Sequence, residues 1–197
     1  MLVWKIQAGN KTLAVFRENS YIPSLTADDV ICPNLARKHN YASNYYVDSA
    51  SGSDLSTGLS WQTAFKTVHK ALQQLPDLME HDVRIWVKSG SNIPSFNCSN
   101  KVGNGLIILI LGNSVVINGS IVFAGCNGVI VQRETTDRSP TIIGQVSLYE
   151  CRLVEFHGIT IDGKNSVDRG VYAERCTKVF LTTCEIRNTT ESAIYNY

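Results

Sequence analysis

The second half of the chain repeats a pattern of apolar residues with a fixed period. Cysteines fall at Cys126, Cys151 and Cys176, and the two gaps between them are equal (151 − 126 = 25; 176 − 151 = 25). Apolar residues around each cysteine recur in the same phase, among them Val129, Val154 and Val179, Val131, Phe156 and Leu181, and Phe123, Leu148 and Ala173. A fixed period with short alternating runs inside it predicts stacked β-strand repeats rather than a closed globule.

The repeat predicts an all-β coil of parallel strands over residues 82–197. Only strand patterns occur in this range, including a continuous apolar run from Leu106 to Leu111. Glycine, asparagine and polar residues interrupt the runs, so each repeat is expected to hold several short strands joined by turns. Such strands hydrogen-bond to their equivalents in the next repeat. The clearest rungs cover residues 121–144, 145–170 and 171–193.

Residues 1–44 differ from the rest and are predicted to form an attachment segment. Alternating stretches at residues 2–7 and 12–17 flank a Gly-Asn turn, which predicts a β-hairpin. Residues 28–39 mix short apolar and charged stretches, which predicts a short helical turn. The segment is too small to be stable alone, so we expect it to dock on another protein or on sister chains.

Residues 45–81 are predicted to lead into the coil and to cover its end. A short strand and a loop rich in turn-forming residues come first. Phe65, Val68 and Leu72 then follow at spacings of 3 and 4 with polar residues between them, which predicts an amphipathic helix capped by Thr63. A coil of strands leaves an apolar end that must be covered, and this helix suits that role.

Composition and charge narrow the classes of function. Apolar residues make up 44% of the chain, which is enough to build a core and disfavours wholesale disorder. The formal net charge is +1 without long basic runs, so nucleic acids and anionic membranes are not expected partners. Apolar runs are too short to cross a bilayer, and residues 1–7 do not read as a secretory signal.

The repeated cysteines are predicted to be interior packing groups. At equivalent rung positions they would stack as buried thiols, which behave as small apolar groups. Free thiols are the favoured interpretation for Cys126, Cys151 and Cys176. Neighbouring rungs are roughly 4.8 Å apart, which permits sulfur contact and leaves a disulfide open. Zinc is not expected, because cysteine and histidine pairs at ligand spacing are missing from the sequence.

Several stretches resemble a known family. Residues 151–161 (CRLVEFHGITI) and 176–186 (CTKVFLTTCEI) are similar to rungs of right-handed parallel β-helices of the pectate-lyase-like superfamily. Residues 46–72 resemble the entry segment and N-terminal cap of such helices, a combination frequent in tail spikes and tail-fibre-like proteins of bacteriophages. The resemblance covers roughly residues 45–197. It is more specific for fold than for activity, because this fold carries many functions.

The resemblance implies a structural virion protein, the N-terminal part of a phage tail spike or receptor-binding tail fibre. Such a protein would be made in the host cytoplasm and would bind other tail or baseplate proteins through residues 1–44. As a homotrimer it would attach the virion to a host surface polysaccharide. Because the sequence stops within a rung, we expect further rungs, and any catalytic site, beyond Tyr197.

Two alternatives stay open at this point. One is an enzyme, a polysaccharide lyase or glycoside hydrolase that depolymerises capsule or a pectin-like polymer, and the same spike can both attach and cleave. The other is a cell-surface adhesin, which is expected to carry a signal or an anchor.

Lyases that resemble these rungs use Asp, Lys or Arg on the outer face of one sheet, often with Ca²⁺ held by carboxylates. The nearest candidates are Asp162, Lys164, Asp168 and Arg169, at a predicted corner of the coil. In a lyase the basic residue would abstract a proton next to a uronate carboxylate. The favoured interpretation is a solvated turn with a chance mixture of charges.

Asp48 and Asp54 are weaker candidates for a Ca²⁺ site, since glycine lies between them in the entry loop. Their spacing lacks the pattern of an EF-hand. Aspartates that hydrogen-bond the backbone of their own loop are the favoured interpretation. His157 falls on the outward phase of its strand and is interpreted as a surface histidine.

Overall fold

The computed structural model describes residues 3–8, 11–17 and 41–197, with side chains only in the last of these ranges. The chain divides into two compact units, residues 1–40 and 41–197. In the first unit, strands β1 (Val3–Ala8) and β2 (Lys11–Arg17) pair antiparallel, as the alternation there predicts. The helical turn predicted in residues 28–39 lies outside the described residues.

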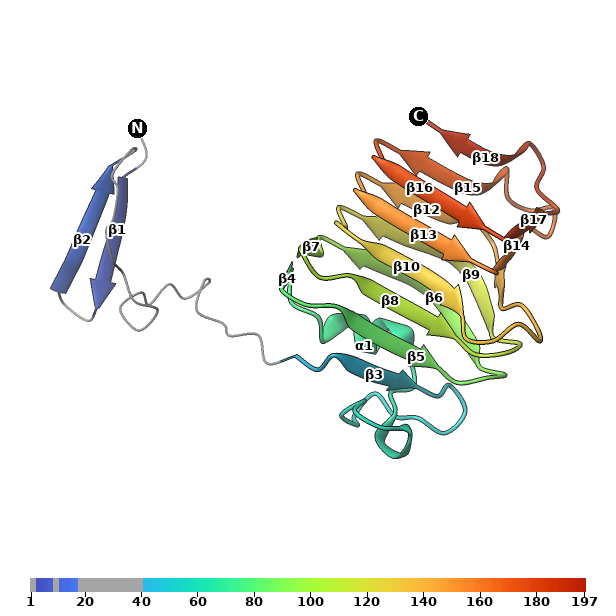
Figure 1. Cartoon of the computed structure of the whole chain (residues 1–197), viewed down its shortest axis with the longest axis horizontal. Coiled ribbons are helices and arrows are strands. Elements are labelled where there is room, and N and C mark those ends of the chain that lie inside the picture. Colours follow the sequence, from blue (N-terminus) through green and yellow to red (C-terminus); the bar gives the residue numbers. More distant parts are fainter. Residues whose placement is uncertain (1–2, 9–10, 18–40) are drawn as a thin grey trace. The chain divides into compact units, whose positions relative to one another are not determined.

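Residues 41–197 form an all-β parallel coil of about five turns, with rungs of about 25 residues (Figure 1). One face of the coil is a six-stranded parallel sheet in which each strand belongs to a successive rung. Its strands, in spatial order, are β3 (Asn44–Val47), β5 (Val83–Val87), β8 (Ile107–Leu111), β10 (Val129–Arg133), β13 (Leu153–His157) and β16 (Lys178–Thr182).

The second, eight-stranded sheet branches at β9. In the next rung two shorter strands, β11 and β12, pair with the first and second parts of β9. Gly144, with φ +142°, lies between these two strands. A Cβ at Gly144 would lie 2.8 Å from the backbone nitrogen of Ser120, so the bend requires glycine. The strands are β6 (Asn92–Ser99), β9 (Val116–Ala124), β11 (Thr141–Ile143), β12 (Val146–Tyr149), β14 (Thr160–Asp162), β15 (Arg169–Glu174), β17 (Glu185–Arg187) and β18 (Ser192–Asn196).

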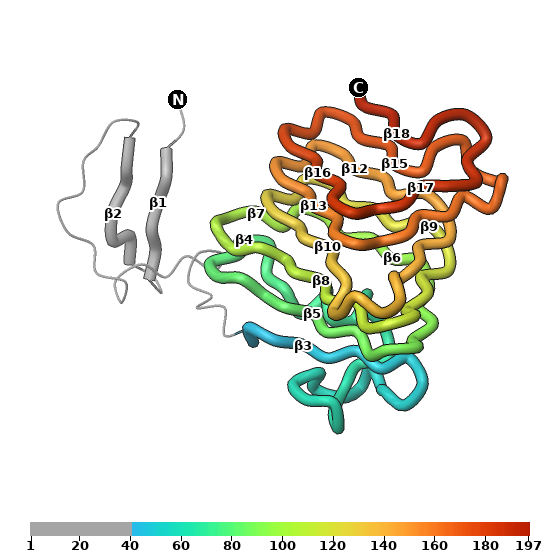
Figure 2. The backbone as a smooth tube through the Cα atoms, turned by 45° about the vertical axis from the view of Figure 1, so that its right-hand side comes forward, coloured from blue at the N-terminus to red at the C-terminus, as the bar shows by residue number. Residues whose placement is uncertain are grey.

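The observed register follows the repeat. Val129 pairs with Val154, and Val154 pairs with Val179, so each rung places its equivalent residue directly on the one before. Figure 2 shows the rungs stacked from β3 at one end to β16, β17 and β18 at the other. The 25-residue period in the sequence is therefore the length of one turn of the coil.

Apolar side chains fill the interior along the axis of the coil. The largest fully buried residues include Phe65, Phe123 and Phe156, which come from different rungs, and Leu148, which shares a rung with Phe156. Inward-pointing residues alternate with outward-pointing residues along each strand, so β13 shows buried Val154 and Phe156 between more exposed neighbours. Burial of these stacked residues is the main source of stability, because neighbouring rungs bury each other's surface.

The predicted cysteine column lies in this interior. Cys126 and Cys151 are buried, and Cys176 in the last rung is half-buried. All five cysteines in the described part of the chain are free thiols, and Cys98, on the rung before Cys126, places its sulfur 4.0 Å from the Cys126 sulfur. The structure therefore confirms that the cysteines pack inside the coil.

A helix and short elements complete the entry region. Helix α1 (Val68–Gln73) packs against β3, β5 and β6 through buried Val68, Ala71 and Leu72, and η1 (Trp61–Thr63) precedes it. A small parallel pair, β4 (Leu78–Met79) and β7 (Val102–Gly103), lies on the path between rungs.

The prediction that Thr63 caps the helix is wrong. The N-cap is Thr67, whose side chain accepts a hydrogen bond from the backbone nitrogen of Lys70. The helix starts later because Phe65 bridges to Val47 and is held extended beside the first strand. Asp54 also accepts hydrogen bonds from the backbone nitrogens of residues 66 and 67, which stabilises this extended segment.

Candidate functional site

A groove crosses four successive corners on the outside of the coil, where the chain turns into β8, β10, β13 and β16. Its volume is about 540 Å³. Three rung steps of ~4.8 Å give it a length of roughly 14 Å along the axis. The lining consists of residues 103–106, 127–128, 152–153, 155, 177–178 and 180. This concave surface in the described part of the chain draws residues from four rungs, so we treat it as the candidate site.

Two unpaired cations lie on the groove. Arg152 and Lys178 come from neighbouring rungs, because Leu153 pairs in register with Lys178. Both residues are exposed, and neither side chain makes a hydrogen bond or ion pair with another described residue. Their charges are therefore available to a ligand, and they favour one that carries carboxylate or phosphate groups.

The same groove offers an acidic group and an apolar ring. Glu155 accepts a hydrogen bond from His157, with 2.9 Å between Oε2 and Nε2. Phe180 is 49% exposed although it is aromatic, and it lies directly beside Glu155 in the ladder of β13 and β16. An exposed aromatic ring beside polar groups is a common arrangement in sites that bind sugar rings or other amphipathic ligands.

Glycines line the end of the groove that lies at the corners before β8 and β10, where neighbouring rungs pack closely. A Cβ on Gly105 would lie 2.2 Å from the carbonyl oxygen of His81, and a Cβ on Gly128 would lie 2.3 Å from Cδ2 of Leu106. The chain therefore turns tightly at these two corners, whereas Arg152 and Lys178 extend from the two later corners. The groove consequently is lined by glycine, asparagine and Leu106 at one end, and by the charged side chains of Arg152 and Lys178 at the other.

The corner after β14 holds the candidates Asp162, Lys164, Asp168 and Arg169, away from the residues that line the groove. Asp162 is buried and accepts hydrogen bonds from Asn188 Nδ2 (3.0 Å), from Arg187 Nε (3.1 Å) and from the backbone nitrogen of Lys164 (3.0 Å). The bond from Asn188, helped by those from Lys164 and Arg187, lowers the pKa of the Asp162 carboxyl. The Asp162 carboxylate therefore links its own rung to the following rung through hydrogen bonds.

Replacing Asp162 by asparagine is expected to lower the free energy of unfolding by about 1 kcal/mol at pH 7. A carboxyl whose pKa is lowered on folding stabilises the protein above its unfolded pKa of about 3.9, and this contribution is lost as the pH falls through the folded pKa. The difference between wild type and Asp162→Asn should therefore shrink below about pH 4. Urea unfolding at a series of pH values measures it, and a difference that does not change with pH would contradict this role.

The other three residues of that corner are not brought together as a catalytic set. Lys164 is exposed and adopts a left-handed conformation with φ +53°. Asp168 accepts a hydrogen bond from Thr190 Oγ1 at 2.9 Å. Arg169 forms an ion pair with Glu191, with 3.5 Å between the groups. Asp168 and Arg169 thus contact residues of the following rung, and they do not contact each other or Lys164 through these bonds.

Arg169 instead joins a row of tyrosines that was not predicted from the sequence. Its guanidinium carbon lies 4.1 Å from the ring centroid of Tyr195 and 5.6 Å from that of Tyr172. The rings of Tyr172 and Tyr195 stack at 5.5 Å with an angle of 3°, and Tyr149 lies 5.7 Å from Tyr172. A signal existed, because these tyrosines recur every 23 residues (172 − 149 = 23; 195 − 172 = 23). The row stabilises the outer face by stacking and cation–π contacts.

The candidates Asp48 and Asp54 accept hydrogen bonds from the protein itself. Asp48 Oδ1 accepts from the backbone nitrogens of Ala50 and Ser51, and its Oδ2 lies 2.6 Å from Lys88 Nζ. Asp54 Oδ1 accepts from two backbone nitrogens, and its Oδ2 accepts from Thr67 Oγ1. These bonds favour the structural interpretation of both aspartates, and Ca²⁺ binding here stays a prediction.

Among the described residues, no group of three or more His, Cys, Asp or Glu side chains is placed to hold a metal ion. Helices in the same part of the chain are too short to cross a membrane. Comparison with protein-family models, curated proteins and solved structures found no match to the chain.

Proposed function

We propose that the protein attaches to a surface polysaccharide through the groove at the corners of β8, β10, β13 and β16. The observation that carries the proposal is the combination of unpaired Arg152 and Lys178 with exposed Phe180 in one elongated concavity. An elongated groove with both charged and aromatic side chains suits a polymer of sugar units better than a compact metabolite. The cations favour polysaccharides that carry acidic groups.

The wider role that we propose is host attachment by a bacteriophage tail spike or tail fibre. A parallel coil provides a rigid shaft, on which a groove formed by several rungs keeps its shape without relying on flexible loops. Residues 1–44 would join the shaft to tail or baseplate proteins, and the protein would act as a homotrimer. We further propose that the coil is right-handed, the preferred hand of parallel crossovers, and that α1 covers its first apolar end.

Filling the groove should abolish attachment without unfolding the protein. Thr177 lines the groove and is exposed, so Thr177→Trp places a large ring in the path of the polymer. We expect the variant to bind at least about tenfold more weakly than wild type, which corresponds to ~1.4 kcal/mol. Binding is measured on an array of neutral, carboxylated and phosphorylated bacterial polysaccharides at fixed ionic strength.

The matched control is Thr136→Trp, which introduces the same ring at an exposed position after β10, at the opposite end of that strand from the groove. It should bind the array like wild type. Failure of wild type to bind any polymer, or equal loss in both variants, would contradict the proposed function. Incubating the bound polymer with the protein and analysing it for new reducing or unsaturated ends distinguishes attachment alone from depolymerisation.

A further inference from the structure

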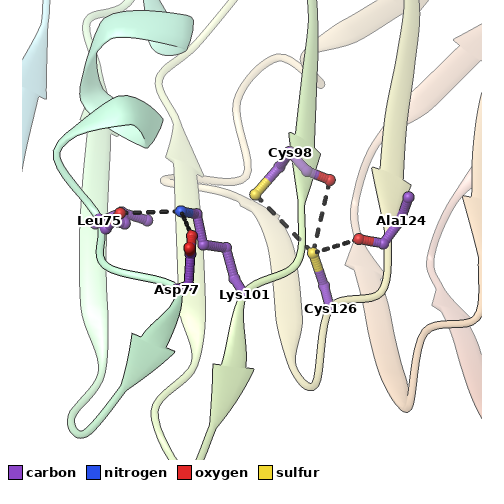
Figure 3. Close-up of polar contacts among 6 residues, drawn as sticks. All are labelled: Leu75, Asp77, Cys98, Lys101, Ala124 and Cys126. Atoms are coloured by element: carbon purple, nitrogen blue, oxygen red, sulfur yellow. Dashed lines mark hydrogen bonds and ion pairs between the residues drawn. The ribbon is translucent and has the colours of Figure 1, made fainter. Parts of the chain in front are cut away.

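Two thiols meet inside the coil at the contact between its early rungs. Cys98 ends the inward-facing part of β6, and Cys126 follows β9, the strand with which β6 pairs. Their sulfur atoms are 4.0 Å apart, and Cys126 Sγ also lies 3.6 Å from the carbonyl oxygen of Cys98 (Figure 3). Both cysteines are buried, with exposures of 3% and 1%. The contact is therefore fixed by the packing of two rungs.

The two sulfurs have different surroundings. Cys126 donates its S–H toward the Cys98 sulfur, which lowers the pKa of the Cys98 thiol, and the nearby Lys101 ammonium lowers it further against the effect of burial. Lys101 is held in place by Leu75 and Asp77, with 2.9 Å from Nζ to the carbonyl oxygen of the first and to Oδ1 of the second (Figure 3). A thiol near a fixed cation is the more nucleophilic member of such a pair.

The second thiol is the weaker acid. A hydrogen bond with Cys151 favours the charged form of Cys126, but the bond to Cys98 and burial outweigh it and raise the pKa of Cys126 to about 11. The hydrogen bond with Cys126, followed by burial, also raises the pKa of Cys151. The column thus has one sulfur suited to attack, at Cys98, and neighbours that stay protonated.

We propose that Cys98 and Cys126 are an oxidation site, at which a peroxide converts the thiol pair into a disulfide that joins two rungs. The Cys98 thiolate attacks one oxygen of hydrogen peroxide and becomes a sulfenic acid, while the O–O bond breaks and the departing hydroxide takes up the proton lost by the Cys98 thiol and leaves as water. The Cys126 sulfur then attacks the Cys98 sulfur, its proton and the hydroxyl leave as a second water, and the S–S bond forms. Overall, two thiols and one hydrogen peroxide give one disulfide and two waters.

Bond formation requires the sulfurs to close from 4.0 Å to about 2.05 Å, which side-chain rotation and a small rung movement can provide. The cross-link would close a loop between residues 98 and 126 and would hold β6 against β9. Because the thiols persist in a reducing cytosol and oxidise outside it, the disulfide would form after the protein leaves the cell. This inference does not depend on what the groove binds.

The test uses the intact protein treated with hydrogen peroxide and then digested under conditions that block thiol exchange. Peptide mapping should find residues 98 and 126 linked, and two fewer free thiols per chain. The midpoint of thermal unfolding should rise by about 5–10 °C relative to the reduced protein. Adding a thiol reductant should restore both the thiol count and the original midpoint.

Variants make the assignment specific. Cys98→Ala and Cys126→Ala should each abolish the peroxide-induced rise in the midpoint, measured against the same variant in the reduced state. Cys184→Ala is the control, because this half-buried thiol donates to the carbonyl oxygen of Phe156 in another part of the coil, and it should keep the full rise. A wild-type map that links Cys126 to Cys151, links two chains, or shows only sulfinic acid at Cys98 would overturn the proposal.

Discussion

Truncating Phe156 to alanine is expected to lower the free energy of unfolding by about 3–5 kcal/mol. The side chain is fully buried on β13, and it pairs in register with Val131 on one rung and Leu181 on the next. Its removal leaves a cavity between three stacked rungs. The backbones on both sides are held by parallel ladders, so they cannot move inward to fill the space, and the cavity cost adds to the lost burial.

Chemical denaturation followed by circular dichroism measures this loss. Phe180→Ala removes the same group from the next rung, but Phe180 is 49% exposed, so its loss should be within about 0.5 kcal/mol of zero. Equal losses in the two variants would mean that the interior of the coil does not carry its stability. A loss confined to Phe156→Ala would show that stacked apolar residues do.

The coil could be predicted from the sequence because its register repeats a local pattern. Val129, Val154 and Val179 share a phase in the sequence, and they are paired in the structure because every rung follows the same path. In a solenoid, contacts between strands connect residues one period apart, so the period fixes the partners directly. In a closed globule the same apolar runs would leave the pairing of strands undetermined.

Details that depend on single contacts between rungs could not be predicted in this way. Cys98 lies 28 residues before Cys126, outside the period, because its partner in the ladder is Phe123, three residues before Cys126. The helix starts at Thr67 because Asp54, distant in sequence, holds the preceding residues extended. Neither a contact between positions of different phase nor a long-range side-chain bond leaves a periodic trace.

The candidate site was missed for a related reason. Clusters of charge in the sequence indicate the corner at residues 162–169, whose carboxylates instead bond the following rung. Arg152 and Lys178 stand alone in the sequence and become neighbours only when the rungs stack. Comparing equivalent corner positions across the period would have brought them together, but the concavity itself depends on how tightly the glycine corners turn.

Gly58→Ala is expected to lower the free energy of unfolding by roughly 2–5 kcal/mol, the sum of two costs. Gly58 has φ +72°, where a Cβ is strained by about 1–2 kcal/mol. The same Cβ would also lie 2.1 Å from Cε2 of Phe65, which is buried where the entry loop meets the first strand. Gly58 cannot move away easily, because its carbonyl accepts from Tyr46 and its N–H donates to Thr63.

Gly90→Ala separates the two costs. Gly90 has almost the same φ, +73°, but a Cβ there meets nothing within 4 Å. This variant should therefore lose only the backbone cost of about 1–2 kcal/mol, and the excess loss in Gly58→Ala measures the clash with Phe65. Thermal and urea unfolding of the two variants give the comparison. If both lose the same amount, the entry loop adapts around Phe65, and tight packing of the loop on that ring does not contribute to the start of the coil.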